Sequence, residues 1–355
     1  MARLTPFEPG EKEIDYEKLI KEFGTKPISG IKNLPDLKAF RKGIVFSHRD
    51  FDKYLDAIKK KKKVSILTGF NASGSIHLGH KRTFDVVIDL QKKYKIPVYI
   101  PISDDESYVF RKIKDQKEGL KNAKLIAKQM IALGFDRKIT KIFIHQQYTK
   151  IYNLAIKLSR PTLSEVKAIY GFNDSTNTGA MFYPIIQAAD ILLPQELLGK
   201  HHTVVPIGID QDPHVRLSRD IAEKFGYIKP STIHTKYLPG LRGGKMSVSI
   251  PGSTIFLNDN PEKAAKKIMN ALTGGRETVE EQRKLGGRPD KCVVFDYHEM
   301  FLNEKELEKI KKDCLAGKLM CGQCKKILAK NVKKYLKGFQ ARVKKVKIEK
   351  YLIRD

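Results

Sequence analysis

The sequence has 355 residues, of which 41% are hydrophobic, and its 68 Lys and Arg residues against 40 Asp and Glu give a net charge of +28. This length suits two domains, and this hydrophobic content excludes a chain that is disordered throughout. The charge predicts a polyanionic partner, nucleic acid first, with a lysine-rich surface in an organism that grows at high temperature as the alternative.

The apolar pattern also excludes a membrane protein. No run approaches the roughly 20 apolar residues that a bilayer span needs, and the first ten residues have no apolar core of an export signal. Without an export signal, the four cysteines indicate a reducing compartment and not a disulfide scaffold. We therefore expect a cytoplasmic protein that does not bind membranes.

The order of apolar runs along the chain predicts an α/β fold followed by an all-helical domain. Residues 1–63 are polar and end in a lysine run, which predicts an N-terminal extension capped by a helix. Between residues 64 and 258, predicted strands alternate with predicted helices, and this alternation indicates a parallel sheet with crossover helices. The strands are 64–68, 96–102, 141–145 and 203–209, and the helices 76–94, 118–133, 183–193 and 212–225. Residues 259–355 show only helical patterns, at 261–272, 304–314 and a basic 322–352.

A small-residue loop joins the first predicted strand to the first predicted helix. It runs from Gly69 through Ser73 to the sequence His77-Leu78-Gly79-His80. At this place in a parallel sheet, backbone N–H groups and the helix dipole bind phosphates. Two histidines three residues apart point the same way, and imidazoles there can stabilise charge that develops on a phosphate. Taken alone, the motif also fits two ordinary histidines at a helix start.

A second loop, after the fourth predicted strand, reads Gly243-Gly244-Lys245-Met246-Ser247-Val248-Ser249. A lysine between glycines and small hydroxyls supplies a mobile positive charge to β- and γ-phosphates. An ordinary surface loop is the alternative. The two motifs together, in this order, are far more specific than either one.

These two motifs look like the HxGH and KMSxS signatures of class I aminoacyl-tRNA synthetases. Three further segments, at 183–193, 206–214 and 274–278, resemble tryptophanyl-tRNA synthetases, and the archaeal branch most closely. The resemblance runs from about residue 13 to the C-terminus. It implies a Rossmann-type catalytic domain at 64–258 with inserted helices, a helical anticodon-binding domain at 259–355, and a homodimer.

The resemblance also implies the reaction. ATP with Mg²⁺ would activate L-tryptophan to tryptophanyl-adenylate and release pyrophosphate, and the aminoacyl group would pass to the 3′ end of tRNA(Trp). Its catalytic residues would be His77, His80 and Lys245, with Gly79 under the adenine and Asp210 on the ribose. The ATP-binding residues would be Gly69, Ser73, His77, Gly79, His80, Gly208, Asp210, Lys245, Met246, Ser247 and Ser249.

Amino-acid recognition departs from one branch of the family. Archaeal and eukaryotic members often hold the indole nitrogen with a Tyr and a Gln where this chain has Leu67 and Pro101. Asp190 instead matches the bacterial Tyr-Pro-x-x-x-Ala-Ala-Asp helix, and a carboxylate on the helix surface is the alternative reading. Tyr183, Gln187 and Asp190 fall on one helix face. The predicted tryptophan contacts are Leu67, Glu106, Tyr183, Gln187, Asp190 and Gln211.

All four cysteines lie in the helical C-terminal part. Cys292, Cys314, Cys321 and Cys324 have a spacing that can complete a four-sulfur site, and free cysteines clustered by chance are the alternative. Zinc and a [4Fe–4S] cluster fit such a set equally well. A subset of tryptophanyl-tRNA synthetases carries a [4Fe–4S] cluster with nearly this spacing, and this resemblance favours the cluster over Zn²⁺.

The sequence leaves two alternatives to the tryptophan enzymes. Tyrosyl-tRNA synthetase is the nearest, although Leu67 and the sequence Asp210-Gln211-Asp212-Pro213 favour the tryptophan enzymes. A catalytically retired RNA-binding relative is another, and the intact motifs argue against it. The basic last helix predicts contact with tRNA phosphates, with a solvated lysine face as the alternative.

Overall fold

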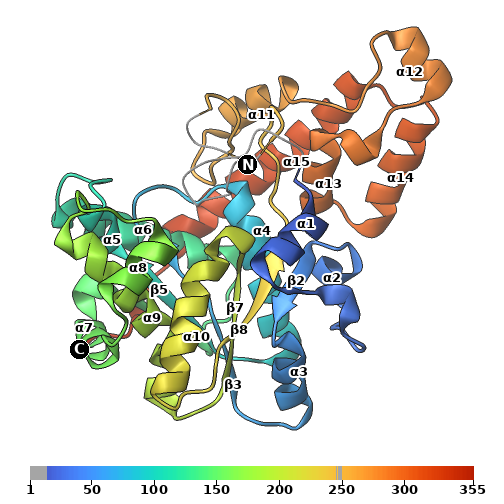
Figure 1. Cartoon of the computed structure of the whole chain (residues 1–355). Helices are drawn as coiled ribbons and strands as arrows, with labels where there is room; N and C mark the ends of the chain where they lie inside the picture. The colour runs from blue at the N-terminus through green and yellow to red at the C-terminus, as the bar shows by residue number, and fades with distance from the viewer. Residues whose placement is uncertain (1–13, 245, 247–249) are drawn as a thin grey trace. The chain divides into compact units, whose positions relative to one another are not determined.

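The structure is a computed structural model that describes residues 14–244, 246 and 250–355. The chain divides into two compact units, which are described separately (Figure 1). The sheet unit comprises Asp15–Gly74, Thr83–Lys236 and Val346–Asp355, and the helical unit contains Ser75–Arg82 and Tyr237–Lys345. None of the helices in the described ranges is long and apolar enough to cross a membrane.

The sheet unit is built on eight strands in the order β1-β2-β8-β7-β3-β5-β4, with β6 pairing beside β5. All pairs among β3 to β8 are parallel, which confirms the predicted parallel sheet. The four predicted strands are present as β3 (Val64–Leu67), β5 (Val98–Ser103), β6 (Thr140–Ile144) and β7 (His202–Gly208). Because β3 lies between β5 and β7, the strand order reverses there, where ligands bind in sheets of this type.

Four strands were not predicted from the sequence. They are β1 (Lys26–Pro27), β2 (Val45–Arg49), β4 (Phe70–Asn71) and β8 (Ser231–Thr235). Hydropathy does not predict β8, because Ser, Thr and His make up four of its five residues, although all five are buried. The His234 ring has a partner on each nitrogen: the Ser47 hydroxyl lies 2.8 Å from Nδ1, and Asp212 lies 3.2 Å from Nε2. The buried hydroxyl of Thr232 has no hydrogen-bond partner among the described residues.

The described residues of the predicted N-terminal extension are part of the sheet unit. Strands β1 and β2 add an antiparallel edge next to β8. Arg49, at the end of β2, forms a two-pronged ion pair with the buried Asp212 at 2.7 Å for each oxygen. Such paired hydrogen bonds hold a guanidinium in one orientation. The segment is therefore anchored to the sheet and to the helix that begins at Asp212.

Helices surround the sheet in this unit. The described set is α1 (Tyr16–Phe23), α2 (Lys38–Arg41), α3 (Phe51–Lys59), most of α4 (Leu78–Tyr94), α5 (Asp104–Val109), α6 (Gln116–Leu133), α7 (Lys150–Leu158), α8 (Leu163–Tyr170), α9 (Thr178–Leu198) and α10 (Asp212–Lys224). Short 3₁₀ turns lie at Ile28–Gly30, His145–Gln147 (η2), Ile209–Gln211 (η3) and Ile348–Lys350.

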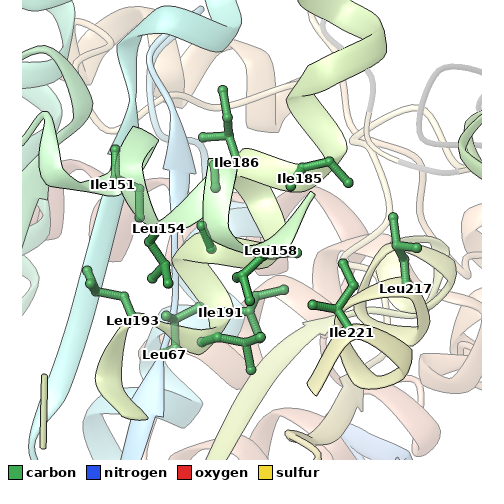
Figure 2. Close-up of a cluster of buried hydrophobic side chains, with 14 of the residues drawn as sticks. Leu67, Ile151, Leu154, Leu158, Ile185, Ile186, Ile191, Leu193, Leu217 and Ile221 are labelled. Atoms are coloured by element: carbon green, nitrogen blue, oxygen red, sulfur yellow. The ribbon is translucent and has the colours of Figure 1, made fainter. Parts of the chain in front are cut away.

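Helix α9 is the centre of the main hydrophobic cluster. Between Tyr183 and Gln195 most of its residues are buried on all sides of the helix, and α9 packs against α7, α10 and the central strands. The cluster joins Leu67 of β3 to apolar residues of these helices (Figure 2). A polar side chain on α9 therefore sits in an apolar setting and needs a hydrogen-bond partner from another element.

The C-terminal segment also belongs to the sheet unit. The predicted helix 322–352 was too long, because α15 ends at Lys345. The chain then runs alongside β6, where Ile142 donates its N–H to Tyr351 and accepts from Ile353, both at 2.8 Å. The Asp355 carboxylate accepts from the N–H groups of Thr149 and Lys150, at 2.9 and 3.2 Å, at the start of α7.

The helical unit contains the remaining helices. They are α11 (Pro261–Met269), α12 (Val279–Leu285), α13 (Val293–Phe301), α14 (Glu304–Leu315) and α15 (Cys321–Lys345), with a 3₁₀ turn at Pro289–Lys291. Helices α11 and α13 both pack against α15, whose buried face carries Leu328, Val332, Leu336 and Phe339. The predicted all-helical C-terminal part is confirmed.

Candidate active site

The two histidines of the HxGH motif form a stacked pair in the helical unit. Their ring centroids are 3.5 Å apart, and the backbone N–H of each residue donates to Nδ1 of the other at 3.3 Å. Because Nδ1 accepts in both rings, the ring proton of each neutral imidazole lies on Nε2. Burial lowers the pKa of His77 to about 4 and the pKa of His80 well below its ordinary value. At pH 7 both rings are therefore neutral Nε2–H donors.

Gly79 gives this pair its space. A Cβ at Gly79 would lie 2.9 Å from Cε1 of His77 and 3.4 Å from the sulfur of Met246, so any other residue would push the His77 ring aside. The contact of Gly79 with adenine stays a prediction. Of the second motif, Met246 is buried, while Lys245, Ser247 and Ser249 lie outside the described residues.

The other predicted ATP-binding residues belong to the sheet unit. A Cβ at Gly69 would come within 3.0 Å of the Pro101 ring, and the exposed Ser73 donates its N–H to Asn71 at 2.7 Å. Gly208 is the last residue of β7, and the buried Asp210 follows in η3. The predicted ATP-binding residues thus come from both units.

The predicted tryptophan-binding residues Tyr183, Gln187 and Asp190 all lie on α9 in the sheet unit. Two of them have a polar partner from another element: Gln187 accepts from the Tyr170 hydroxyl of α8 at 2.7 Å, and Asp190 bonds to His145 of η2. The Tyr183 ring meets the Phe110 ring edge-on, with the ring centroids 5.8 Å apart. The structure therefore gathers α8 and η2 around this face of the helix.

Asp190 belongs to a buried network of charged groups. His145 is fully buried, and its Nε2 lies 2.9 Å from Oδ1 of Asp190 while its Nδ1 lies 2.8 Å from Oδ1 of Asp105. The Tyr152 hydroxyl donates to Oδ2 of Asp105 at 3.1 Å. Burial alone would lower the pKa of His145, but the two carboxylates raise it well above its ordinary value. His145 is accordingly an imidazolium that donates to both carboxylates.

Glu106 has a partner at the end of β5. The Ser103 hydroxyl donates to Oε2 of Glu106 at 3.1 Å. Burial raises the pKa of Glu106, while hydrogen bonds from Asn71 and Ser103 oppose that rise. Leu67 lies in the same hydrophobic cluster as Tyr183, and Gln211 directs its amide toward Asp210 at 3.5 Å.

Tyr170, the partner of Gln187, forms an aromatic pair with His214. The rings of Tyr170 and His214 stack with their centroids 4.1 Å apart. Nδ1 of His214 is buried without a hydrogen-bond partner among the described residues. Burial lowers the pKa of His214 to about 4, so this ring is neutral at pH 7.

The sequence reading missed Ser103, His145 and Tyr170. Two of them had a usable signal: Ser103 ends β5 and His145 directly follows β6, so both stand at the carboxyl ends of parallel strands, where ligands bind. Tyr170 carried none, because it ends a short helix whose position against α9 depends on the tertiary fold.

The four cysteines lie near one another in the helical unit. Burial raises the pKa of Cys324 to about 12, and the charges of Cys292, Cys314 and Cys321 add to the rise. Three glycines leave room for them: a Cβ would lie 2.8 Å from the Cys321 sulfur at Gly275, 2.7 Å from the Cys314 sulfur at Gly287, and 3.1 Å from Cβ of Cys292 at Gly274. Within the described ranges, however, no three His, Cys, Asp or Glu side chains are arranged to hold a metal ion.

A basic groove lies between α11 and α15. It has a volume of about 490 Å³, an apolar floor and a row of lysines. Its residues are Ala265, Met269, Lys326, Ala329, Lys330, Lys333, Lys334 and Lys337. Lys333 also forms an ion pair with Glu262 at 2.7 Å.

Comparisons with known proteins agree with this geometry. The family described as tRNA synthetases class I (W and Y) matches residues 59–337. A tryptophan–tRNA ligase of Methanocaldococcus jannaschii is 43% identical, with 98% of this chain and 96% of that protein covered, and one of Methanopyrus kandleri is 40% identical, with 95% and 93% covered. The crystal structure of a tryptophanyl-tRNA synthetase from Aeropyrum pernix has a TM-score of 0.86 at 39% identity and covers 96% of this chain and 97% of that one.

Proposed function

The chain belongs to the class I tRNA synthetases for tryptophan and tyrosine, and from this premise we propose that it is a tryptophan–tRNA ligase. It activates L-tryptophan with ATP to tryptophanyl-adenylate and pyrophosphate, then transfers the tryptophanyl group to the 3′ end of tRNA(Trp). The full-length similarity to curated tryptophan–tRNA ligases supports this substrate over tyrosine.

One observation in the structure supports the amino-acid site: Tyr183, Gln187 and Asp190 lie on α9, and partners from other elements hold Gln187 and Asp190. Asp190 is buried and not a surface carboxylate. A buried acceptor left unpaired is costly, so this carboxylate suits a ligand that brings a donor, such as the indole N–H. Tyr183, Gln187 and Gln211 bind the ammonium and carboxylate groups, with Glu106 near the ammonium and Leu67 against the ring.

Nucleotide activation is assigned to the two motifs. His77 and His80 donate Nε2–H bonds to phosphate oxygens, and their neutral state at pH 7 leaves the positive charge to Lys245 and to Mg²⁺, which accompanies the triphosphate. Lys245, with Ser247 and Ser249, stabilises the leaving pyrophosphate. Asp210 binds the ribose, and Gly69, Ser73, Gly79, Gly208 and Met246 line the adenosine.

The basic groove is assigned to tRNA. Five lysines line one groove and can neutralise backbone phosphates, and such contacts position a nucleic acid without reading its bases. The enzyme works as a cytoplasmic homodimer, in line with the resemblance that the sequence shows.

For the four cysteines we propose a [4Fe–4S] cluster, with Zn²⁺ as the alternative. Their thiols are the donors that both groups prefer, and the three surrounding glycines leave room beside the sulfur atoms. Cys292, Cys314, Cys321 and Cys324 would bind it and so join α13, α14 and α15; the bound group supplies a cross-link and no redox step.

Pyrophosphate exchange with tryptophan and tyrosine in parallel tests the main proposal. Exchange with tryptophan supports it, robust exchange with tyrosine alone would identify the sister enzyme, and no exchange with any amino acid would identify a retired relative. Anaerobic purification with metal analysis tests the cysteine site. About four irons per chain would support the cluster, and one tightly held zinc would favour Zn²⁺ instead. Four titratable thiols without metal would exclude a metal site.

A further inference from the structure

Asp190 does not stand alone on α9, because a buried imidazolium holds it from outside the helix. The bond from His145 reaches Oδ1 of Asp190 at 2.9 Å. Within the described part of the chain, no other group donates a hydrogen bond to Asp190. The second oxygen, Oδ2, is therefore the one left for a ligand.

His145 is itself held on its other side. Its Nδ1 donates to Oδ1 of Asp105, and this same oxygen accepts the N–H of Glu106 at 2.8 Å. Tyr152 of α7 donates to the remaining oxygen of Asp105. The imidazole ring thus has one orientation, set by groups from two other elements.

A carboxylate on a helix turns easily about its last side-chain bond, because the rotation that ends an Asp side chain has a broad energy profile. A donor fixed by a rigid partner removes that freedom and points the second oxygen in one direction. Groups that bind a ligand depend on such partners for geometry, much as metal ligands depend on the groups that orient them.

We propose that His145 is a positioning residue for tryptophan: it fixes the Asp190 carboxylate so that Oδ2 accepts the indole N–H. This inference rests on the proposed function and adds to it the residue that sets recognition of the nitrogen. His145 directly follows the buried apolar end of β6 (Ile142, Phe143 and Ile144), and the two carboxylates are the partners that a fully buried imidazole needs there.

The test compares tryptophan with an analogue in which sulfur replaces the indole N–H, 3-(benzothiophen-3-yl)-L-alanine, in pyrophosphate exchange. The wild-type enzyme should prefer tryptophan by about tenfold or more, as expected for a site that offers an acceptor to the indole N–H. In His145→Gln, kcat/KM for tryptophan should fall roughly tenfold, mainly through KM, while the analogue changes little. The KM for ATP should stay the same.

A double-mutant cycle separates positioning from general stability. If His145 acts through Asp190, adding His145→Gln to Asp190→Asn should cause almost no further loss of tryptophan preference. Independent losses that multiply would overturn the proposal, as would an unchanged preference in His145→Gln. The matched control is His202→Gln, at the start of β7 opposite Val64, which should behave as wild type.

Failure of the proposed function and failure of the role of His145 give different results. A wild-type enzyme that exchanges no tryptophan would overturn the proposed function itself, whereas active wild type with an unaltered preference in His145→Gln would overturn only the role of His145. If His145→Gln does not fold, proton NMR of ¹⁵N-histidine-labelled wild type replaces it. Tryptophan, and not the sulfur analogue, should then shift the ring N–H signals of His145, whose two ring nitrogens are both hydrogen-bonded. Equal shifts with both ligands would overturn the proposal.

Discussion

The hydroxyl of Tyr170 lies 2.7 Å from Oε1 of Gln187, so a side chain from α8 fixes the amide of a residue on α9. In the proposed tryptophan site, with Oε1 already accepting this bond, the NH₂ group of Gln187 would donate to the ligand. A donor suits the carboxylate of tryptophan better than its ammonium.

We expect Tyr170→Phe to raise the KM for tryptophan and to leave the KM for ATP unchanged. The lost hydrogen bond is worth about 0.5–1.5 kcal/mol, or roughly two- to tenfold in KM. Steady-state pyrophosphate exchange measures both constants. The control is Tyr227→Phe, which removes a hydroxyl bonded to Glu196 on the exposed side of the unit. Equal effects of the two variants would refute a role for Tyr170 in the site.

The stacked histidines predict a pH dependence of folding. Burial lowers the pKa of His77 from 6.5 to about 4. As the pH falls from 6.5 toward 4, His77 becomes protonated in the unfolded chain but stays neutral in the folded chain. The free energy of unfolding therefore decreases. His77→Asn lacks this loss. The stability difference between wild type and variant should therefore shrink on acidification in urea unfolding at pH 7, 5.5 and 4.5; a constant difference would contradict the buried neutral ring.

Lys245 of the second motif should act on pyrophosphate and not on the amino acid. We expect Lys245→Ala to slow adenylate formation strongly while the Kd for tryptophan stays close to that of wild type. Single-turnover activation and equilibrium binding measure the two quantities separately. A parallel loss of tryptophan affinity would contradict this assignment.

The basic helix α15 should matter for tRNA and not for activation. Charge reversal at Lys333, Lys334, Lys344 and Lys345 should lower kcat/KM for tRNA by about tenfold or more and make its salt dependence shallower, because fewer phosphates are neutralised. Pyrophosphate exchange should be unchanged. Reversal of the exposed Lys59, Lys60, Lys61 and Lys62 is the matched control with the same change of charge. Losses of equal size in both reactions would argue against a tRNA surface here.

The glycines beside the cysteines should be sensitive to a single methyl group. A Cβ at Gly275 would lie 2.8 Å from the Cys321 sulfur, so Gly275→Ala should cost about 1–3 kcal/mol of stability by overpacking. Gly322→Ala, in α15 with no atom within 4 Å of the new Cβ, should be neutral or slightly stabilising. Denaturant unfolding under anaerobic conditions compares them, with the metal content recorded for each. A neutral Gly275→Ala would show that the cysteine sulfurs lie elsewhere.

The sequence predicted the alternating core of the sheet unit because buried parallel strands are short apolar runs between helices. It failed at β8, where polar residues are buried and Ser231, His234 and Thr235 have hydrogen-bond partners that only the tertiary fold supplies. It failed again at the end of α15, because the basic composition continues beyond Lys345 although the chain leaves the helix.

The same limit applies to the candidate site. Helical spacing placed Tyr183, Gln187 and Asp190 on one face of α9, and the structure confirms that helix. Tyr170, the partner of Gln187, and His145, the partner of Asp190, lie 17 and 45 residues away in sequence, on elements whose mutual position no local pattern fixes. Local periodicity therefore predicts which side chains face a site but not which groups orient them.

The C-terminal segment that pairs with Ile142 covers an outer strand of the sheet. An uncovered edge offers free N–H and C=O groups to a strand of another molecule and so promotes aggregation. Here Tyr351 and Ile353 occupy the N–H and C=O of Ile142 in the middle of β6, and at the opposite edge β1 has only two residues, one of them Pro27. A strand of another molecule thus finds little continuous backbone to pair with at either border of the sheet.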